Sequence, residues 1–275
     1  MAKFTVVTAC RNAARHIEET LKSVLGQSVF RAGKHGLEYL LCDGASTDGT
    51  LEILRPYESR GLRVVSRSDA GFYAGLAKGL QEAAGDYIAY LNAGDLLHPA
   101  GLDIAAECFE VPGVDWLTGY AAILNDKSQL TRCWLPYRYR RNLFACGAYG
   151  TLLPFLQQES TVWRRKLHAG VDFSFLAKLR YAGDAYLWKC FAEQSELTLV
   201  RGLIGGFRVH AGQISERVDE YLRELRTFSR PASVAERARC LVDRVLWWTP
   251  EQFKMVACGE ALLRNDTATQ AWRRA

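Results

Sequence analysis

The chain has 275 residues and a mass of 30.8 kDa, with 35 Lys and Arg residues against 30 Asp and Glu residues, for a formal net charge of +5. Its hydrophobic fraction of 49% and charged fraction of 24% are typical of a globular protein and exclude a disordered, collagen-like or fibrous chain. That length fits one large domain, or a catalytic domain with an appendage.

Neither a membrane span nor a disulfide framework is expected. No apolar run reaches the roughly 18 residues that a spanning helix requires, and the apolar stretch near Met1 is too short for a signal-peptide core. We therefore expect a cytosolic protein. The eight cysteines are scattered from Cys10 to Cys258 without a CxxC pair, which indicates reduced core residues rather than disulfides or structural zinc.

The first half of the chain alternates strand and helix signals. Strands are expected at 4–9, 37–42, 62–66 and 87–92, and helices from residue 17 with Asn12 as a candidate cap, at 50–57 and at 74–84. Short strands separated by helices predict βαβ crossovers and a mainly parallel sheet, which binds ligands at the carboxyl ends of its strands. Polar residues follow each of the four strands, and they predict a site on that edge.

The pattern loosens after residue 113. Strand candidates lie at 116–124, 130–135, 161–164 and 197–209, the last broken by Gly205 and Gly206, and a helix is expected at 184–192. From Glu216 onward the composition is helical and rich in arginine. We therefore divide the chain into residues 1–215, with halves 1–112 and 113–215, and a helical C-terminal extension, 216–275.

The stretch DGASTDGT, residues 43–50, is the most informative segment. Asp43 projects at a strand tip, where its carboxylate can accept hydrogen bonds from a ribose hydroxyl or a base amide. Ser46, Thr47 and Asp48 can cap the following helix. The alternative for Asp43 is an ordinary turn residue, and for Ser46 and Asp48 the capping role is favoured.

Three more segments carry candidate chemistry. Asp95, after the strand at 87–92, can hold a divalent cation that also bridges phosphates, or it can cap the next helix. Asp184 opens a predicted helix, where a cap is the commoner role. His210 follows a strand, where a structural histidine is more common than a ligand.

Together and in this order, seven segments resemble the family 2 glycosyltransferases, in the branch that acts in bacterial polysaccharide synthesis of the colanic-acid type. They are FTVVTACRN with LKSVLGQS, DGASTDGT, SRSDAGFYAGLAKGL, YIAYLNAGDLLHP, QQESTVW, AGDAYLWKCFA and FRVHAGQIS, and they span about residues 3–215. The resemblance implies an α/β GT-A fold, Rossmann-like, and an inverting enzyme that uses a nucleotide-sugar donor.

The resemblance also implies roles for individual residues. Asp184 is the expected catalytic base and Glu159 the alternate. Asp95 and His210 are expected to bind a divalent cation, Mn²⁺ or Mg²⁺. The nucleotide-sugar site is expected to include Thr8, Ala9, Arg11, Asp43, Asp69, Lys78, Asn92 and Ala93.

Three departures from the family pattern are visible. Asn92 and Gly94 stand where relatives often carry further acids, which leaves Asp95 as the single strong cation ligand. The segment from Tyr73 to Gly79 lacks polar residues that relatives commonly have there. Gly183 replaces the acid that usually precedes the base.

The implied activity is transfer of a sugar, from a UDP-sugar as first choice, to a hydroxyl of a glycan or lipid-linked saccharide in cell-surface polysaccharide synthesis. A noncatalytic nucleotide-sugar-binding or scaffold subunit is the alternative. A dinucleotide oxidoreductase is disfavoured because the turn after the first strand lacks GxGxxG, and a sugar nucleotidyltransferase because no basic glycine-rich loop follows that strand.

Two further features concern partners, among which no nucleic acid is expected. Residues 132–180 hold nine Lys or Arg residues and two acids, so the net charge of this window is +7, whereas that of the whole chain is +5. Its arginines are candidates for contacting an anionic acceptor or membrane surface, with a solvated basic face as the alternative; they are Arg138, Arg140, Arg141, Arg164 and Arg165. The C-terminal helices are expected to pack on the catalytic domain or against a dimer partner, or to attach peripherally to the inner face of the plasma membrane through Trp247 and Trp248.

Overall fold

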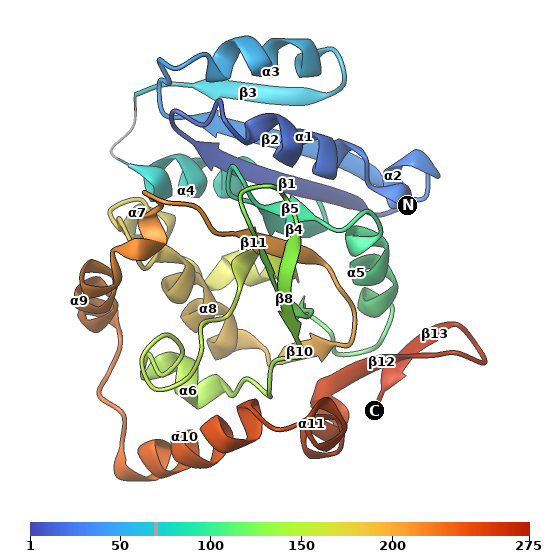
Figure 1. Ribbon diagram of the computed structural model, residues 1–275, viewed down its shortest axis with the longest axis vertical. Helices are drawn as coiled ribbons and strands as arrows, with labels where there is room; N and C mark the ends of the chain where they lie inside the picture. The colour runs from blue at the N-terminus through green and yellow to red at the C-terminus, as the bar shows by residue number, and fades with distance from the viewer. Residues whose placement is uncertain (69–70) are drawn as a thin grey trace.

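A computed structural model describes residues 1–68 and 71–275 (Figure 1). Within them the main sheet has nine strands in the order β13-β12-β10-β6-β9-β4-β1-β2-β3. These strands are β1 Lys3–Cys10, β2 Gly36–Asp43, β3 Leu62–Ser66, β4 Tyr87–Tyr90, β6 Trp116–Thr118, β9 Thr161–Arg164, β10 Leu197–Val200, β12 Leu262–Asp266 and β13 Ala271–Arg274. β9 runs antiparallel to its neighbours β4 and β6, and β13 antiparallel to β12, while the other pairs are parallel. The predicted mainly parallel α/β sheet is confirmed.

A second sheet of four strands, counted over the same residues, stands beside the main one in the order β5-β11-β7-β8. Its strands are β5 Leu96–Leu97, β7 Ala121–Leu124, β8 Leu130–Trp134 and β11 Gly205–Arg208. The single strand predicted at 116–124 is therefore wrong, because the chain leaves the main sheet at Gly119, where a Cβ would clash with the Gly202 carbonyl. The predicted strand 197–209 is interrupted between Val200 and Gly205, so Gly205 begins β11 rather than breaking a strand. A side chain at Gly205 would clash with the Glu159 backbone.

Helices cover both faces of the main sheet. They are α1 Ile17–Leu25, α2 Ser28–Arg31, α3 Thr50–Glu58, α4 Phe72–Glu82, α5 Gly101–Phe109, α6 Arg141–Ala145, α7 Phe173–Leu176, α8 Gly183–Gln194, α9 Val218–Phe228, α10 Val234–Trp247 and α11 Glu251–Cys258. Asn12 does not cap α1: His16 occupies that position, and the Asn12 side chain instead accepts a hydrogen bond from the Thr47 N–H.

The strand periodicity of two divides the core into two parts. Val6 and Leu41 face the cluster formed with α1, α3 and α5, whereas their neighbours Val7 and Leu40 face the cluster formed with α4, α6 and α8. Both sides of the central strands are thus buried, which explains why these strands read as continuous apolar runs in the sequence.

The segment after residue 215 packs against the rest of the fold. Trp247 of α10 is buried against Tyr139, and the Lys254 ammonium donates to the Leu135 carbonyl. The expected helices are present, and after them the β12–β13 hairpin, which the sequence analysis missed, extends the main sheet beside β10. Among the described helices, none combines the length and the apolar character needed to cross a bilayer. The cysteines are free, and all but Cys133 are buried.

Candidate active site

The carboxyl ends of three neighbouring strands form one row at the edge of the sheet. The register pairs Cys10 with Asp43 and Asp43 with Ser66, so these residues lie side by side. Asp43 is 2% exposed, and its carboxylate accepts hydrogen bonds from the Ser46 N–H at 3.1 Å, the Ser66 hydroxyl at 2.6 Å and the Ser46 hydroxyl. The predicted edge is present, and the nucleoside role of Asp43 stays a prediction.

The DGASTDGT turn mainly holds a neighbouring turn in place. Ser46 accepts a hydrogen bond from the Asn12 N–H at 2.7 Å, and Asp48 accepts one from the Ala14 N–H at 3.0 Å. Asp48 also accepts the N–H of Thr50, the first residue of α3, whereas Ser46 turns away from that helix. The predicted capping by Ser46 is therefore wrong, and the two turns that follow β1 and β2 form one linked rim.

The first strand offers fewer groups to this edge than predicted. Thr8 and Ala9 are buried inside β1, and the Thr8 hydroxyl lies 3.1 Å from the Tyr39 hydroxyl in the core. The Thr8 side chain faces the core, since alternate residues of a strand face opposite sides of the sheet. The expected place of Thr8 and Ala9 along the nucleotide-sugar site stays a prediction. Arg11, in the turn beyond β1, is exposed at the rim.

Two other residues were predicted to contact the donor, Lys78 and Asp69. Lys78 is half-buried and lies six residues into α4, about 9 Å along the helix from its first residue. Asp69 lies outside the described residues. Asn92 and Ala93 are at the rim, half-buried, directly after β4.

Asp95 links three elements. One carboxylate oxygen accepts the Arg208 N–H at 2.9 Å, and the other accepts the Gln158 amide at 3.0 Å. Its carbonyl accepts the Thr20 hydroxyl at 3.0 Å. Burial raises the pKa of Asp95, and the nearby Arg208 N–H and guanidinium partly oppose the rise. Asp95 does not cap α5, whose cap position is Ala100.

A fully buried arginine supports the turn that carries Asp95. The Arg208 guanidinium donates to the Gly94 carbonyl at 2.6 Å, to the Asp126 carbonyl at 3.0 Å and to the Glu19 carboxylate at 2.7 Å. A fixed positive charge therefore lies behind the rim at the place where Asn92 and Gly94 leave the acidic motif thin.

His210 lies at the same rim, beside a second histidine. The His210 and His16 ring centroids are 5.5 Å apart, and His16 Nε2 lies 3.0 Å from an Asp126 carboxylate oxygen. Burial, followed by the charge of Arg208, lowers the pKa of His16 and favours its neutral form. The His210 Nδ1 is 3.0 Å from the Ala211 carbonyl.

The described residues do not by themselves complete a metal centre. Both Asp95 oxygens are engaged by donors of the chain itself, a buried guanidinium lies beside them, and no group of three or more His, Cys, Asp or Glu side chains in residues 1–68 and 71–275 is arranged to hold an ion. Asp95 links β11 to the turn after β4, and its assignment with His210 as a cation ligand stays a prediction.

Asp184 lies in the first turn of α8. The end of α8 leads into the start of β10, and β10 runs in the same direction as β1. The beginning of α8, with Asp184, therefore lies at the carboxyl edge of the sheet. The side chain is partly exposed and lines a hollow shared with Phe155, Trp188, Tyr221 and Leu225. Burial raises the pKa of Asp184 from its ordinary 3.8 to about 6. Such a carboxylate is ionised at neutral pH and is a stronger base than an exposed aspartate.

Tyr73 of α4 supports this end of α8. Its hydroxyl accepts the Asp184 N–H at 3.3 Å and donates to the Tyr181 carbonyl at 3.3 Å. A Cβ at Gly183 would clash with the Tyr73 ring. The glycine that replaces the usual acid before the base therefore has a steric reason in this chain.

Glu159 is a buried acid between two others. It is 3% exposed, one of its oxygens has no hydrogen-bond partner among the described residues, and its pKa is raised by burial and then by the charges of Asp95 and Asp184. These conditions favour the protonated form. The burial of Glu159 speaks against its predicted role as an alternate base near the acceptor, because a covered carboxyl group is poorly placed to take a proton from a substrate.

The sequence analysis missed Glu224 of α9. Its carboxylate accepts three consecutive backbone N–H groups just before α8: Arg180 at 2.8 Å, and Tyr181 and Ala182 at 2.7 Å each. A residue of the C-terminal segment thus holds in place the short backbone segment that leads into Asp184. Nothing in the local sequence marks this glutamate, since the partners are more than 40 residues apart.

The basic window is used for internal contacts. Arg140 pairs with Asp243, which is fully buried, at 2.7 Å and 3.1 Å. Arg141 donates to the carbonyls of Ala192 and Glu193 at the far end of α8, about 12 Å along the axis from Asp184. Arg138 lies 3.9 Å from an acid, Glu196.

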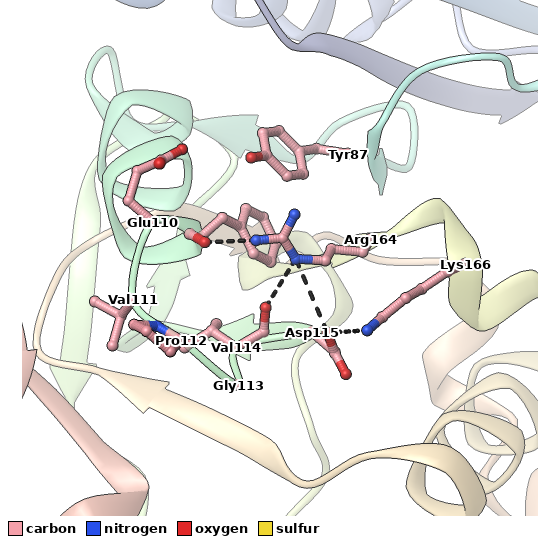
Figure 2. A pocket seen from close by; sticks show the side chains of 10 residues that line it. Tyr87, Glu110, Val111, Pro112, Gly113, Val114, Asp115, Arg164 and Lys166 are labelled. Atoms are coloured by element: carbon pink, nitrogen blue, oxygen red, sulfur yellow. Dashed lines mark hydrogen bonds and ion pairs between the residues drawn. The ribbon is translucent and has the colours of Figure 1, made fainter.

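Arg164 and Arg165 lie at the opposite edge of the sheet. Arg164 pairs with Tyr87, the first residue of β4, because β9 is antiparallel to β4. Figure 2 shows the Arg164 guanidinium near the Tyr87 ring in a pocket of about 500 Å³, where it donates to the Val114 carbonyl and lies near Asp115. Arg165 donates to the Gly85 carbonyl. The prediction that these five arginines form an acceptor surface is therefore corrected.

Comparison with known proteins supports the family resemblance. A sequence model of the family "Glycosyl transferase family 2" matches residues 5–149. The chain is 34% identical over 105 residues to "Putative glycosyltransferase EpsE" and 32% identical over 132 residues to "Putative teichuronic acid biosynthesis glycosyltransferase TuaG", both of Bacillus subtilis. These matches cover 37% and 46% of this chain, and 36% and 50% of the two relatives.

Solved structures share the fold. The Staphylococcus aureus TarS 1–349 complex with UDP-GlcNAc matches with a TM-score of 0.63 at 16% identity, over 94% of this chain and 80% of that one. The mannosyltransferase PcManGT from Pyrobaculum calidifontis, in complex with GDP-Man and Mn²⁺, matches with a TM-score of 0.61 at 17% identity, over 94% of this chain and 75% of that one. The GT-A fold is confirmed. With a family match over more than half of its length, this chain belongs to glycosyl transferase family 2.

Proposed function

We propose that this protein transfers a sugar, with inversion, from a nucleotide diphosphate sugar to an acceptor hydroxyl. The observation that carries the proposal is the Asp184 carboxylate, partly exposed in a hollow at the carboxyl edge of the sheet, with a pKa raised by burial to about 6. A general base needs access to its proton and a pKa close to the working pH, and Asp184 meets both conditions.

In this proposal, the proton of the acceptor hydroxyl passes directly to Asp184. The acceptor hydroxyl gives its proton to an Asp184 carboxylate oxygen as its own oxygen attacks the anomeric carbon, and the bond to the diphosphate breaks on the opposite face. Tyr73 and Glu224 hold the backbone around Asp184. Glu159 is buried, and burial followed by the charges of Asp95 and Asp184 raises its pKa.

For the donor we propose a UDP-sugar first, then GDP- and dTDP-sugars. Support comes from two structures with the same fold, the TarS complex with UDP-GlcNAc and the PcManGT complex with GDP-Man. Asp43 is our candidate for the ribose or base contact, with the Ser46 and Ser66 hydroxyls sharing the same carboxylate.

The PcManGT complex contains Mn²⁺. Because the rim of this chain does not form a protein cage for an ion, we propose that a divalent cation binds here only together with the donor diphosphate, which supplies oxygen ligands of its own.

For the acceptor we propose a glycan or lipid-linked saccharide of a bacterial cell-surface polysaccharide. Support comes from the name of the TuaG relative, which refers to teichuronic acid biosynthesis. The arginines that suggested an anionic acceptor no longer support it.

Two measurements test the proposal. A thermal-shift screen of nucleoside diphosphates and nucleotide sugars identifies the donor, since a ligand that binds the native state raises the melting temperature. With that donor, Asp184→Asn is expected to abolish sugar transfer while donor binding remains. Glu193→Gln, at the exposed far end of α8, is the matched control and should leave transfer unchanged.

The thin acidic motif favours one alternative, a noncatalytic nucleotide-sugar-binding subunit. That function would be supported if the donor bound normally but was neither transferred nor hydrolysed by the unmodified protein. Transfer that persists in Asp184→Asn would instead reject the assignment of the base.

A further inference from the structure

Helix α10 exposes an apolar stripe on its outer side. Val234, Leu241, Val245 and Trp248 follow one another at steps of seven, four and three residues, so they lie along one side of the helix. Their exposed fractions are 86%, 66%, 69% and 69%. The buried positions of the same helix, among them Cys240 and Trp247, lie on the opposite side. The inner side of the helix therefore packs against the fold, whereas the outer stripe is exposed and no described residue covers it.

The charges of α10 are sorted in the same way. Its acids, Glu236 and Asp243, are buried on the inner side, where they pair with Arg230 and Arg140. Its arginines are exposed: Arg237 and Arg244 flank the apolar stripe on one side, and Arg239 lies beyond it on the other. The outer surface of the helix therefore carries apolar and positive side chains, and no exposed acid of α10 offsets them.

The stripe continues onto the next helix. Phe253 and Val256 of α11 are 64% and 85% exposed, whereas Lys254 and Cys258 of that helix are buried. Figure 1 shows α10 and α11 together at one border of the molecule, on the side away from α3. We call the exposed side chains of the two helices the α10–α11 face; they are Val234, Arg237, Arg239, Leu241, Arg244, Val245, Trp248, Phe253 and Val256.

We propose that the α10–α11 face lies on an anionic lipid surface. A helix with an exposed apolar stripe, flanking arginines and an aromatic residue at one end has the composition that binds in the plane of a membrane interface. Arginines near such a surface attract acidic headgroups, which favours a membrane over an uncharged partner. The tryptophan that takes part is Trp248; the expected contact through Trp247 is corrected, since that side chain is 1% exposed.

Vesicle co-sedimentation of the full chain tests the proposal. Binding is expected to vesicles that contain phosphatidylglycerol and to be weak on vesicles of phosphatidylcholine alone. Raising the salt from about 0.1 M to about 1 M shortens the Debye length from about 10 Å to about 3 Å and should release much of the bound protein.

Two pairs of variants separate the apolar and the electrostatic parts. Leu241→Ser combined with Val245→Ser should weaken binding at least about tenfold, because their side chains lose the contact with acyl chains. Leu130→Ser, at an exposed apolar residue of β8, is the matched control. Arg244→Glu should weaken binding by about fivefold or more, and Arg55→Glu on α3 should not.

The altered residues are exposed, so the variants should fold, which circular dichroism verifies. Equal vesicle binding by all variants and the unmodified chain would overturn the proposal. Absence of vesicle binding would also overturn it, and a dimer in analytical ultracentrifugation that Leu241→Ser and Val245→Ser disrupt would then assign the face to a second copy of the chain.

Discussion

Replacing Glu224 tests whether the C-terminal segment positions the catalytic end of α8. The Glu224 carboxylate accepts the N–H groups of Arg180, Tyr181 and Ala182 at 2.7 to 2.8 Å. Glu224→Ala leaves these three donors without their acceptor, and Glu224→Gln keeps the size of the side chain but removes its charge.

The magnitude follows from the number and type of these bonds. Hydrogen bonds to a charged group contribute about 1.5 to 3 kcal/mol each, but Glu224 is partly exposed, so water replaces part of what is lost. We expect Glu224→Ala to lower the free energy of unfolding by about 2 to 4 kcal/mol, and Glu224→Gln by about 1 kcal/mol. Displacement of Asp184 by about 1 Å would reduce kcat by about 100-fold.

The assay is steady-state sugar transfer as a function of pH, with donor affinity measured separately. A positioning role predicts a lower kcat with little change in the donor Kd. It also predicts a shift of the acidic limb to lower pH: burial chiefly raises the pKa of Asp184 to about 6, and the Glu224 charge adds to the rise. Removing that charge makes Asp184 easier to deprotonate.

Glu220→Ala is the matched control, because Glu220 lies one turn earlier on α9 and pairs with Arg217, the residue just before that helix. The same kcat and the same acidic limb in Glu224→Ala and Glu220→Ala would refute the positioning role of Glu224. Loss of stability in Glu224→Ala without any change in the pH profile would show a structural contact alone.

Three further predictions concern other parts of the chain. The rate of transfer should rise with pH around 6 as Asp184 loses its proton. Besides abolishing transfer, Asp184→Asn should raise the free energy of unfolding at pH 7.5 by up to about 3 kcal/mol, because the raised pKa disfavours the folded carboxylate above pH 6. An unchanged free energy of unfolding would contradict the burial of this carboxylate. Asp243→Ala should lower the free energy of unfolding in denaturant by about 3 to 5 kcal/mol, because it leaves Arg140 unpaired. The double variant with Arg140→Met should recover much of this loss, and equal stability of the single and double variants would contradict the role of the ion pair. Calorimetry should detect Mn²⁺ binding only with nucleoside diphosphate present, because the described residues alone do not form a cage for the ion. Tight binding of Mn²⁺ alone that Asp95→Ala removes would contradict the need for the diphosphate.

The central architecture was predictable because it depends on local pattern. The strand at 62–66 was predicted with its observed bounds, and β1 and β2 differ from prediction by one or two residues, since continuous apolar runs between polar turns mark buried parallel strands. The edge that gathers Asp43 and Asn92 followed from the direction of such strands.

Long-range pairing was not predictable from the same pattern. The arginines of the basic window looked like a surface for an anion because their partners, such as Asp243 and the α8 carbonyls, are distant in sequence. The hairpin of β12 and β13 escaped notice because its strands are short and lie after three helices.

The sequence by itself determined the family, the mainly parallel sheet and the edge that carries the site, since these follow from the order of strands, turns and motif residues along the chain. Tertiary structure alone decided which polar groups are available for chemistry. It buried Glu159 and engaged both oxygens of Asp95, left Asp184 partly exposed, and brought Glu224 to the backbone before it. Access and hydrogen-bond partners depend on packing between distant segments, and packing sets which carboxylate is ionised and reachable.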